Sequence, residues 1–362
     1  MGKKVLIFGA GAIGRGFLGP LLSNLNFQLS FVDKNLNLIK KMKSVDSYKA
    51  AIANDKKYDI VTVPIKDAYT LEESFNIKMY DFVFCCVGPK QCYEIAKKFI
   101  NAKTVISCEN DISTVDGLKK LSKNDNIFFG VPDVITSNTA SKELLKKDEL
   151  ITITEKGNLI VEKGNFSLPR PILQANRKEL EKHWKCKFFI HNAPHAILSY
   201  LGSLKKYIYI HEAMSDKKIE KVVLGSIKEI TEGVVRAGYV PKRFAEKYRD
   251  KEIKRFKNKL LFDPIARVAR EPLRKLSKDN RIILALRVAQ FNKKVPKYTA
   301  MGVKAALNYF DEHDPESIYL QNIRKSLTDS EILKKFSGIE ENDPLSAFCL
   351  NQDLSKFKKN EK

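Results

Sequence analysis

Three side chains that can perform acid–base and hydrogen-bond chemistry lie within nine residues of one another: Lys187, Asn192 and His195. On a helix with about 100° per residue they span an arc of about 140°, so they share one face. A partly desolvated lysine can act as a general base, and an amide can donate to an oxygen that gains negative charge. The same spacing also suits an ordinary helix start with a solvated lysine and a capping asparagine, and spacing alone favours that simpler interpretation.

A second constellation shares one of these residues, because His191 and His195 are four positions apart and could place two imidazoles on one metal ion. The sequence has no H-E-x-x-H motif and no cluster of cysteines and histidines that would supply the remaining ligands. We therefore expect no metal site.

The segment Gly9-Ala10-Gly11-Ala12-Ile13-Gly14 is a G-x-G-x-x-G motif that directly follows an apolar run and opens a helical one. In that context the glycines allow a tight turn and a close approach of the backbone to a pyrophosphate. Asp33 ends the next apolar run, where a carboxylate accepts from ribose hydroxyls and favours NAD over NADP. The alternative is a purely structural turn, with Asp33 capping the next helix. The residues expected to bind NAD are Gly9, Ala10, Gly11, Ile13, Gly14 and Asp33.

The first 150 residues indicate the fold that would position such a turn. Nearly continuous apolar runs lie at 4–10, 29–33, 80–87, 104–110 and 126–132, with helical spacing at 35–44 and 90–100. Strands that are covered on both faces have such sequences, and their alternation with helices predicts a doubly wound parallel sheet of the Rossmann type. Residues 50–53 and 59–65 predict a small antiparallel insertion, and residues 151–164 predict a hairpin.

Beyond about residue 183 the apolar residues recur at helical spacing, and strand patterns end. A chain of 362 residues is long enough for two domains. We therefore predict an α/β protein in which an NAD-binding Rossmann domain, residues 1–182, precedes a mostly α-helical C-terminal domain, residues 183–362. The second domain would bind the substrate and carry the catalytic residues.

The charge is unusual, because 65 lysines and arginines against 43 acidic residues give a net charge of +22. Such a chain could bind a nucleic acid or a phosphorylated small molecule, although a lysine-rich solvated surface explains most of the excess. The basic run 242–259 is expected to be such a solvated helix face. The six cysteines form no C-x-x-C pair, as is typical of reduced thiols in a cytoplasmic protein.

Several segments together resemble one enzyme family. Lys187, Asn192 and His195, followed by Tyr200-Leu-Gly202, resemble the signature of the polyol-specific long-chain dehydrogenases. Further segments are similar to the mannitol-1-phosphate 5-dehydrogenase branch of that family, namely FGAGAIGRGF at 8–17, SCEN at 107–110 and RVAREPLRKLS at 267–277. The similarity spans roughly residues 5–325, and the linked motifs make it specific.

This resemblance implies a reversible, metal-independent oxidation of mannitol 1-phosphate to fructose 6-phosphate with NAD. At the matching positions it implies that Lys187 is the general acid/base and that His195 orients the substrate. Asn192 and Asn110 would form the amide pair that stabilises an oxyanion. The residues implied to bind the substrate are Asp133, Arg267, Arg274 and Lys275.

The basic cluster 267–275 suits this role, because arginine binds phosphate in a bidentate manner. A solvated helix face is the alternative. One segment departs from the family, since many relatives read Asp-Arg-Ile-Val-Pro where this chain has Asp133-Val-Ile-Thr-Ser137. The missing arginine leaves open which polyol is bound and where its phosphate lies.

Two other functions stay open at this point. One is a dehydrogenase of an unphosphorylated polyol or a sugar acid, of the mannitol 2-dehydrogenase or uronate reductase type. The other is a non-catalytic NAD-binding protein associated with nucleic acid, which the net charge of +22 suggests. The sequence has no recognised nucleic-acid motif, and no apolar run is long enough to span a membrane. We expect a monomer that acts on a small molecule, without a nucleic-acid or membrane partner.

Overall fold

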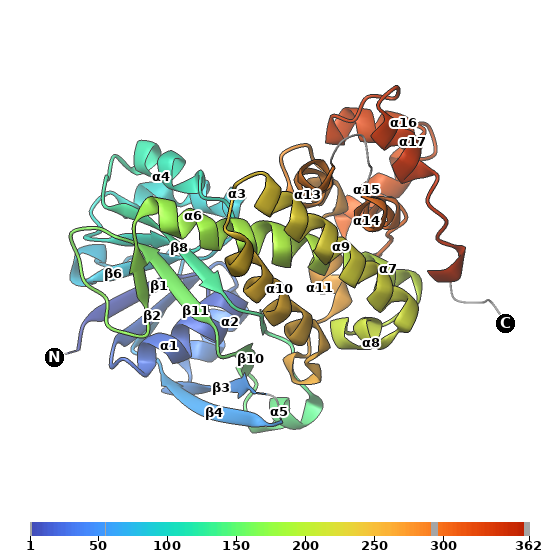
Figure 1. Cartoon of the computed structure of the whole chain (residues 1–362). Coiled ribbons are helices and arrows are strands. Elements are labelled where there is room, and N and C mark those ends of the chain that lie inside the picture. The colour runs from blue at the N-terminus through green and yellow to red at the C-terminus, as the bar shows by residue number, and fades with distance from the viewer. Residues whose placement is uncertain (1, 55, 291–295, 358–362) are drawn as a thin grey trace. The chain divides into compact units, whose positions relative to one another are not determined.

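The computed structural model describes residues 2–54, 56–290 and 296–357. The chain divides into two compact units (Figure 1). The first unit comprises Met1–Trp184 and Leu260–Phe262, and the second comprises Lys185–Lys259 and Asp263–Lys362.

The first unit is built on an eight-stranded sheet with the order β12-β11-β8-β7-β6-β1-β2-β5. The strands from β8 to β5 are all parallel, while β11 runs antiparallel to β8. This arrangement confirms the predicted doubly wound sheet. The strands are β1 (Lys4–Phe8), β2 (Gln28–Asp33), β5 (Asp67–Thr70), β6 (Phe82–Cys85), β7 (Val105–Ser107), β8 (Ile127–Asp133), β11 (Asn158–Glu162) and β12 (Leu173–Ala175).

Alternate residues of each central strand enter two different cores, which is why these strands read as continuous apolar runs. Val5 and Ile7 of β1 belong to one core, and Leu6 and Phe8 belong to the other. All four side chains are fully buried. The helices of this unit are α1 (Gly19–Ser23), α2 (Leu36–Lys43), α3 (Pro89–Glu94), α4 (Thr114–Ser122), α5 (Lys142–Lys147) and α6 (Arg177–Lys185), with 3₁₀ turns at Ile77–Met79 and Ala96–Phe99.

A second, four-stranded sheet has the order β4-β3-β10-β9. Its strands are β3 (Ser47–Ala53), β4 (Tyr58–Pro64), β9 (Thr136–Ser137) and β10 (Thr152–Glu155). The antiparallel pairing of β3 with β4 confirms the predicted insertion. The predicted hairpin at 151–164 is wrong, because β10 pairs with β3 and β9 while β11 pairs with β8 and β12. Each run is apolar enough to be buried in its own sheet, so the two strands do not need each other.

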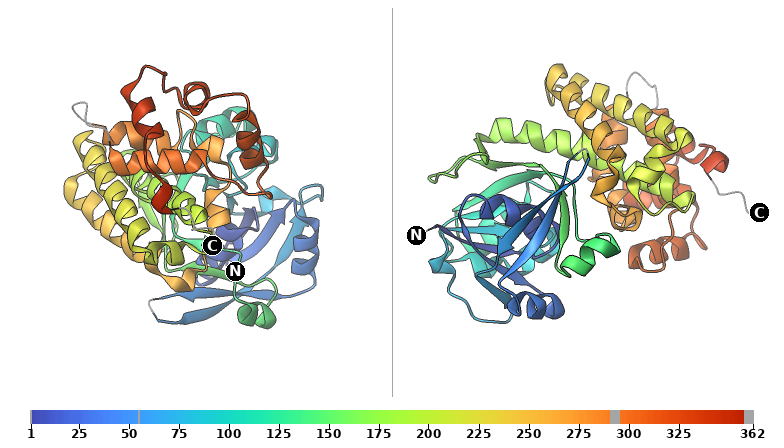
Figure 2. Two further views of the ribbon diagram at one scale, coloured as in Figure 1. Left: turned by 90° about the vertical axis from the view of Figure 1, so that its right-hand side faces the viewer. Right: turned by 90° about the horizontal axis from the view of Figure 1, so that it is seen from below.

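The second unit consists of helices packed on one another, shown from yellow to red in Figures 1 and 2. Its longest helix, α9 (Lys217–Arg236), starts where Asp216 accepts the backbone N–H groups of Lys218 and Ile219. The other helices are α7 (Ala193–Leu204), α8 (Ile210–Ser215), α10 (Lys242–Lys257), α11 (Ile265–Ala269), α12 (Pro272–Lys275), α13 (Arg281–Ala289), α14 (Lys297–Leu307), α15 (Pro315–Ile323), α16 (Asp329–Ile332) and α17 (Pro344–Leu350). Shorter 3₁₀ or π segments lie at Cys186–Asn192, Lys259–Leu261, Leu333–Ser337 and Ser355–Phe357.

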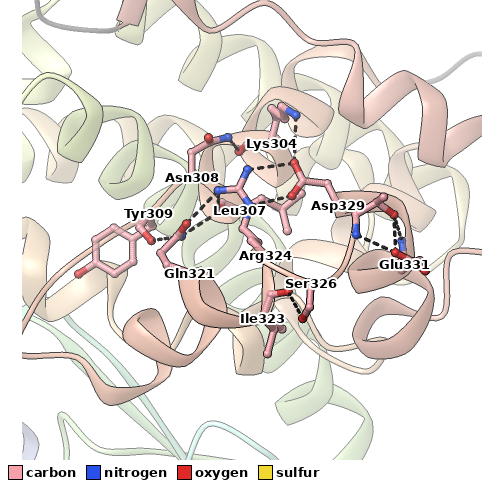
Figure 3. A network of polar contacts seen from close by, with 11 residues as sticks. Lys304, Leu307, Asn308, Tyr309, Gln321, Ile323, Arg324, Ser326, Asp329 and Glu331 are labelled. Atoms are coloured by element: carbon pink, nitrogen blue, oxygen red, sulfur yellow. Dashed lines mark hydrogen bonds and ion pairs between the residues drawn. The ribbon is translucent and has the colours of Figure 1, made fainter.

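A polar network fixes one edge of this helical unit (Figure 3). Arg324 donates to both carboxylate oxygens of Asp329 at 2.7 and 3.1 Å and to the carbonyl oxygen of Leu307 at 2.9 Å. Lys304 adds a 3.2 Å ion pair to the same carboxylate. The network therefore holds the ends of α14, α15 and α16 together. Across the described ranges, no helix combines the length and the apolar character needed to cross a membrane.

Candidate active site

The glycine motif forms a tight turn after β1, and each glycine has a different reason to be there. Gly9 has a φ of +94°, and a Cβ atom on it would lie 2.5 Å from the carbonyl oxygen of Cys86. A Cβ atom on Gly14 would collide with the backbone carbonyl of Gly9. Gly11 is different, because a Cβ atom there would meet no atom within 4 Å. The open space beside Gly11 fits the backbone approach to a pyrophosphate that this motif provides.

Asp33, at the carboxyl end of β2, is fixed against this turn. Its Oδ2 atom accepts the Ala10 N–H at 2.7 Å, and its Oδ1 atom accepts the Asn35 N–H at 2.9 Å. The cap of α2 is Asn35, whose side chain accepts from Leu38. The helix-capping alternative for Asp33 is therefore wrong. Its carboxylate is oriented at the strand end where a ribose-binding acid lies in dinucleotide-binding folds.

Two further predicted residues follow neighbouring strands of the same sheet. Asn110 comes three residues after β7 and is exposed, and its carbonyl oxygen accepts the Trp184 indole N–H at 2.8 Å. Asp133 is the last residue of β8 and is 5% exposed. Both therefore lie toward the carboxyl ends of parallel strands, where open α/β sheets bind their ligands.

Lys187 and Asn192 lie on a π-helix, Cys186–Asn192, that leads directly into α7, where His195 lies. A π-helix joins residues i and i+5, so Lys187 and Asn192 are one turn apart rather than 140° apart. Asn192 is 9% exposed and Lys187 is half-buried. The structure thus brings these two side chains to the same side of the helix more closely than α-helical spacing predicts.

The two histidines of this segment face different carboxylates. The Nδ1 atom of His191 lies 2.5 Å from Oε2 of Glu252, and the Nε2 atom of His195 lies 2.9 Å from Oδ2 of Asp263. Although burial alone would raise it, the charges of Arg267 and His195 lower the pKa of the Asp263 carboxyl to about 2. Within the described ranges, no three His, Cys, Asp or Glu side chains converge in a way that could hold a metal ion.

Arg267 takes part in this arrangement rather than standing alone. Its guanidinium donates to Oδ1 of Asp263 at 2.5 and 3.0 Å, one turn earlier along the chain. The predicted role of Arg267 in substrate binding stays a prediction. The contact shows that this arginine also neutralises the carboxylate that faces His195.

The other basic residues of the predicted cluster are packed against one another. Lys275 is 3% exposed, and its ammonium group donates to the carbonyl oxygen of Arg270. Burial and the charges of Arg281 and Arg274 hold the pKa of the Lys275 ammonium group well below its ordinary value. Burial and the charge of Arg274 likewise lower the pKa of the Arg281 guanidinium to about 10. A buried cation that has further cations beside it favours an anion among them.

Tyr200, from the predicted family signature, lies beside these cations. Its side chain is fully buried, and its hydroxyl has no hydrogen-bond partner among the residues that the structure describes. The charges of Arg281 and Arg274 act on this hydroxyl. Its ring packs 5.3 Å from that of Tyr309, which belongs to the network of Figure 3.

Sequence analysis missed Glu252, Arg255 and Asp263. Glu252 is fully buried and pairs with Arg255 at 2.7 Å, so the basic run 242–259 is not a uniformly solvated helix face, contrary to our expectation. The available signal was the spacing, because Glu252, Arg255 and Phe256 share one face of α10. Asp263 directly precedes Pro264 and belongs to none of the motifs that the sequence shows.

The chain was compared with known families and proteins. Residues 3–128 match the mannitol dehydrogenase Rossmann domain, and residues 179–351 match the mannitol dehydrogenase C-terminal domain. A mannitol-1-phosphate 5-dehydrogenase from Thermoanaerobacter pseudethanolicus is 28% identical, with 98% of this chain and 97% of the relative covered. One from Buchnera aphidicola subsp. Acyrthosiphon pisum is 30% identical, with 91% and 93% covered.

Two solved structures show the same fold. The ternary complex of Pseudomonas fluorescens mannitol 2-dehydrogenase with NAD and D-mannitol has a TM-score of 0.77 at 15% sequence identity, and the match covers 99% of this chain and 94% of that one. A substrate-free D-sorbitol dehydrogenase has a TM-score of 0.65 at 17% identity, covering 96% and 95%. At these identities the two structures support the fold.

Proposed function

The chain belongs to the mannitol dehydrogenase family, and from that premise we propose that it is an NAD-dependent oxidoreductase acting on a hexitol phosphate. The names of its relatives point to mannitol 1-phosphate as the substrate. The family resemblance implies fructose 6-phosphate as the product of its oxidation. The observation that carries the phosphorylated substrate is the buried Lys275 with the half-buried Arg274 and Arg281, beside the unpartnered Tyr200 hydroxyl.

The cofactor part of this proposal rests on the glycine turn. Gly11 leaves open space at the start of the π-helix Ala12–Leu18, and Ala10 and Ile13 flank it. Asp33 would accept hydrogen bonds from the adenosine ribose. Each of its carboxylate oxygens accepts one backbone N–H, which leaves a second lone pair on each oxygen for a ribose hydroxyl. When bound, the nicotinamide accepts or returns a hydride.

The proton chemistry would belong to Lys187. During oxidation the substrate hydroxyl loses its proton to the Lys187 amine, and during reduction the ammonium returns it. Asn192, one π-helical turn away, would donate to the same oxygen as negative charge develops on it. This scheme needs no metal ion. For Asn110 and Asp133 we retain the roles of second amide donor and hydroxyl ligand that the resemblance implies.

We place the phosphate on Lys275 and Arg281, whose side chains have no carboxylate in contact among the residues that the structure describes. Arg274 beside them is already paired with Glu271 at 2.6 Å. A dianionic phosphate would relieve the mutual repulsion of these positive charges and give the Tyr200 hydroxyl an acceptor. The alternative substrate, a sugar acid, also carries an anionic group, so the same observation keeps it as the second candidate.

An NADH-oxidation screen tests this function. The substrates are fructose 6-phosphate, other ketose phosphates, fructose and ketouronates, all at the same concentration. We expect turnover with fructose 6-phosphate to exceed that with the others. A ketouronate as the best substrate would support the sugar-acid alternative, and turnover of none would refute the proposed activity. We propose further that the enzyme is a cytoplasmic monomer without a nucleic-acid partner, which light scattering and a nucleic-acid binding assay at two salt concentrations can check.

A further inference from the structure

His191 and His195 each face a buried carboxylate that the sequence did not mark as part of the site. Glu252 is fully buried, Asp263 is 3% exposed, and His191 and His195 are each 6% exposed. A carboxylate is rarely buried this deeply without a specific purpose, because its desolvation is costly. These carboxylates therefore need an explanation that the fold alone does not supply.

Each carboxylate is held in its ionised form by an arginine. Glu252 pairs with Arg255 at 2.7 Å, and Asp263 pairs with Arg267 at 2.5 Å. Although burial opposes it, the charges of His191 and Arg255 lower the pKa of the Glu252 carboxyl. Both groups are thus anionic at neutral pH, and each histidine faces an acceptor rather than a donor.

The two histidine contacts differ in one respect. His191 is hydrogen-bonded to Glu252 at 2.5 Å. The Nε2 atom of His195 and the Oδ2 atom of Asp263 lie 2.9 Å apart, yet neither has an aligned hydrogen-bond partner among the described residues. A small rotation of the imidazole ring would align them. His191 is thus held by an aligned hydrogen bond, whereas His195 lies within contact distance of its carboxylate without one.

The ring of Phe256 braces both histidines. It stacks on His195 with a centroid distance of 5.0 Å and lies 5.6 Å from the His191 ring. Phe256 and Glu252 lie one turn apart on α10, so one helix face supplies both a carboxylate and an aromatic contact to the segment that carries Lys187.

We propose that Asp263 and Glu252 are positioning residues for this reaction, Asp263 setting the orientation of His195 and the charge beside its ring, and Glu252 anchoring the π-helix of Lys187. This inference rests on the proposed function for its catalytic meaning. The charged and titratable groups around His195 are Asp263, Arg267 and His191, and Glu252 and Arg255 lie beyond His191. Asp263 brings a negative charge next to the His195 ring, and Arg267 balances that charge.

Two variants, which should move the titration midpoint of His195 in opposite directions, test the role of Asp263. The titration midpoint of the His195 imidazole is followed by nitrogen-15 NMR in the full-length protein, which has five histidines. Asp263→Asn removes the negative charge, so the midpoint should move to lower pH by one pH unit or more. Arg267→Met leaves Asp263 unbalanced and should move it to higher pH. An unchanged midpoint in both variants, or a shift in the same direction, would overturn the assignment.

Kinetics then separate positioning from stability. Asp263→Asn should lower kcat at least tenfold. One limb of the wild-type pH–kcat profile should be absent in His195→Asn, and Asp263→Asn should shift the midpoint of that limb. Glu252→Gln should also lower kcat at least tenfold, while KM changes less than threefold. In this variant the midpoint of that limb should stay where it is in the wild type. Wild-type kcat in both folded variants would contradict the inference. The NMR titration needs no substrate, so it tests the relationship between Asp263 and His195 even where the proposed activity is not observed.

Discussion

The carboxylate of Asp33 accepts the backbone N–H of Ala10 at 2.7 Å, which fixes the end of β2 to the first turn of the chain. The contact has a consequence for cofactor choice. Asparagine keeps an oxygen that can accept this N–H but loses the negative charge that repels a 2′-phosphate. We predict that Asp33→Asn raises the ratio of kcat/KM for NADPH to that for NADH about tenfold or more. Unchanged constants for both cofactors would refute the ribose role of Asp33.

Two glycines of the same turn make a matched pair. A methyl group on Gly14 would collide with backbone, whereas one on Gly11 would enter open space. Gly14→Ala should therefore destabilise the protein by about 1–3 kcal/mol, measured by urea unfolding. Gly11→Ala should unfold as the wild type does but bind NADH more weakly, measured by the quenching or enhancement of NADH fluorescence. Wild-type affinity in Gly11→Ala would show that the open space is not where the cofactor binds.

The base assignment is tested at Lys187. Lys187→Ala should keep its affinity for NADH and lose about 10²–10⁴-fold in kcat, because general-base catalysis contributes about that much. The matched control is Lys185→Ala, since the Lys185 ammonium lies over the Tyr239 ring at 4.4 Å and serves no chemistry in this scheme. Stopped-flow or steady-state NADH oxidation measures both. Near-normal kcat in Lys187→Ala would mean that another group takes the proton.

Sequence periodicity predicted the parallel sheet because buried strands must be apolar on both faces, as Leu6 and Ile7 show. It failed at residues 151–164, where alternation specifies a strand but not its partner. It also failed to reveal the π-helix that brings Lys187 and Asn192 one turn apart. The change from i+4 to i+5 bonding leaves no mark on apolar spacing over seven residues.

The candidate site was only half visible in the sequence for a related reason. Lys187, Asn192 and His195 are close along the chain, so a motif can show them. Glu252 and Asp263 reach the histidines from segments about 60 residues away, and only the packing of α10 and the start of α11 reveals those contacts. In the sequence Glu252 is one acid in a basic run.

Buried His191 predicts how stability depends on pH. Burial lowers the pKa of the His191 imidazole from 6.5 to about 4, although the negative charge of Glu252 acts to raise it. Between these values the unfolded chain binds a proton that the folded protein does not, so the free energy of unfolding falls as the pH drops from 6.5 to 4, by about 3 kcal/mol.

His191→Asn keeps a donor for Glu252 and removes the titration. Its free energy of unfolding, measured in urea between pH 7 and 4.5, should therefore fall less steeply than that of the wild type. Parallel curves for the two proteins would show that His191 is not the titrating group.

The proposed substrate carries a phosphate that Lys275 and Arg281 bind, and a single kinetic comparison can decide whether it does. We would measure kcat/KM for fructose 6-phosphate and for fructose in the wild type, in Arg281→Met and in Arg287→Met. Arg287 lies on the same helix and pairs with Asp343 at 2.8 Å, so it controls for the lost charge. We predict a wild-type preference for fructose 6-phosphate of about 100-fold, kept in Arg287→Met and reduced about tenfold or more in Arg281→Met. A wild-type kcat/KM no better for fructose 6-phosphate than for fructose would contradict the account.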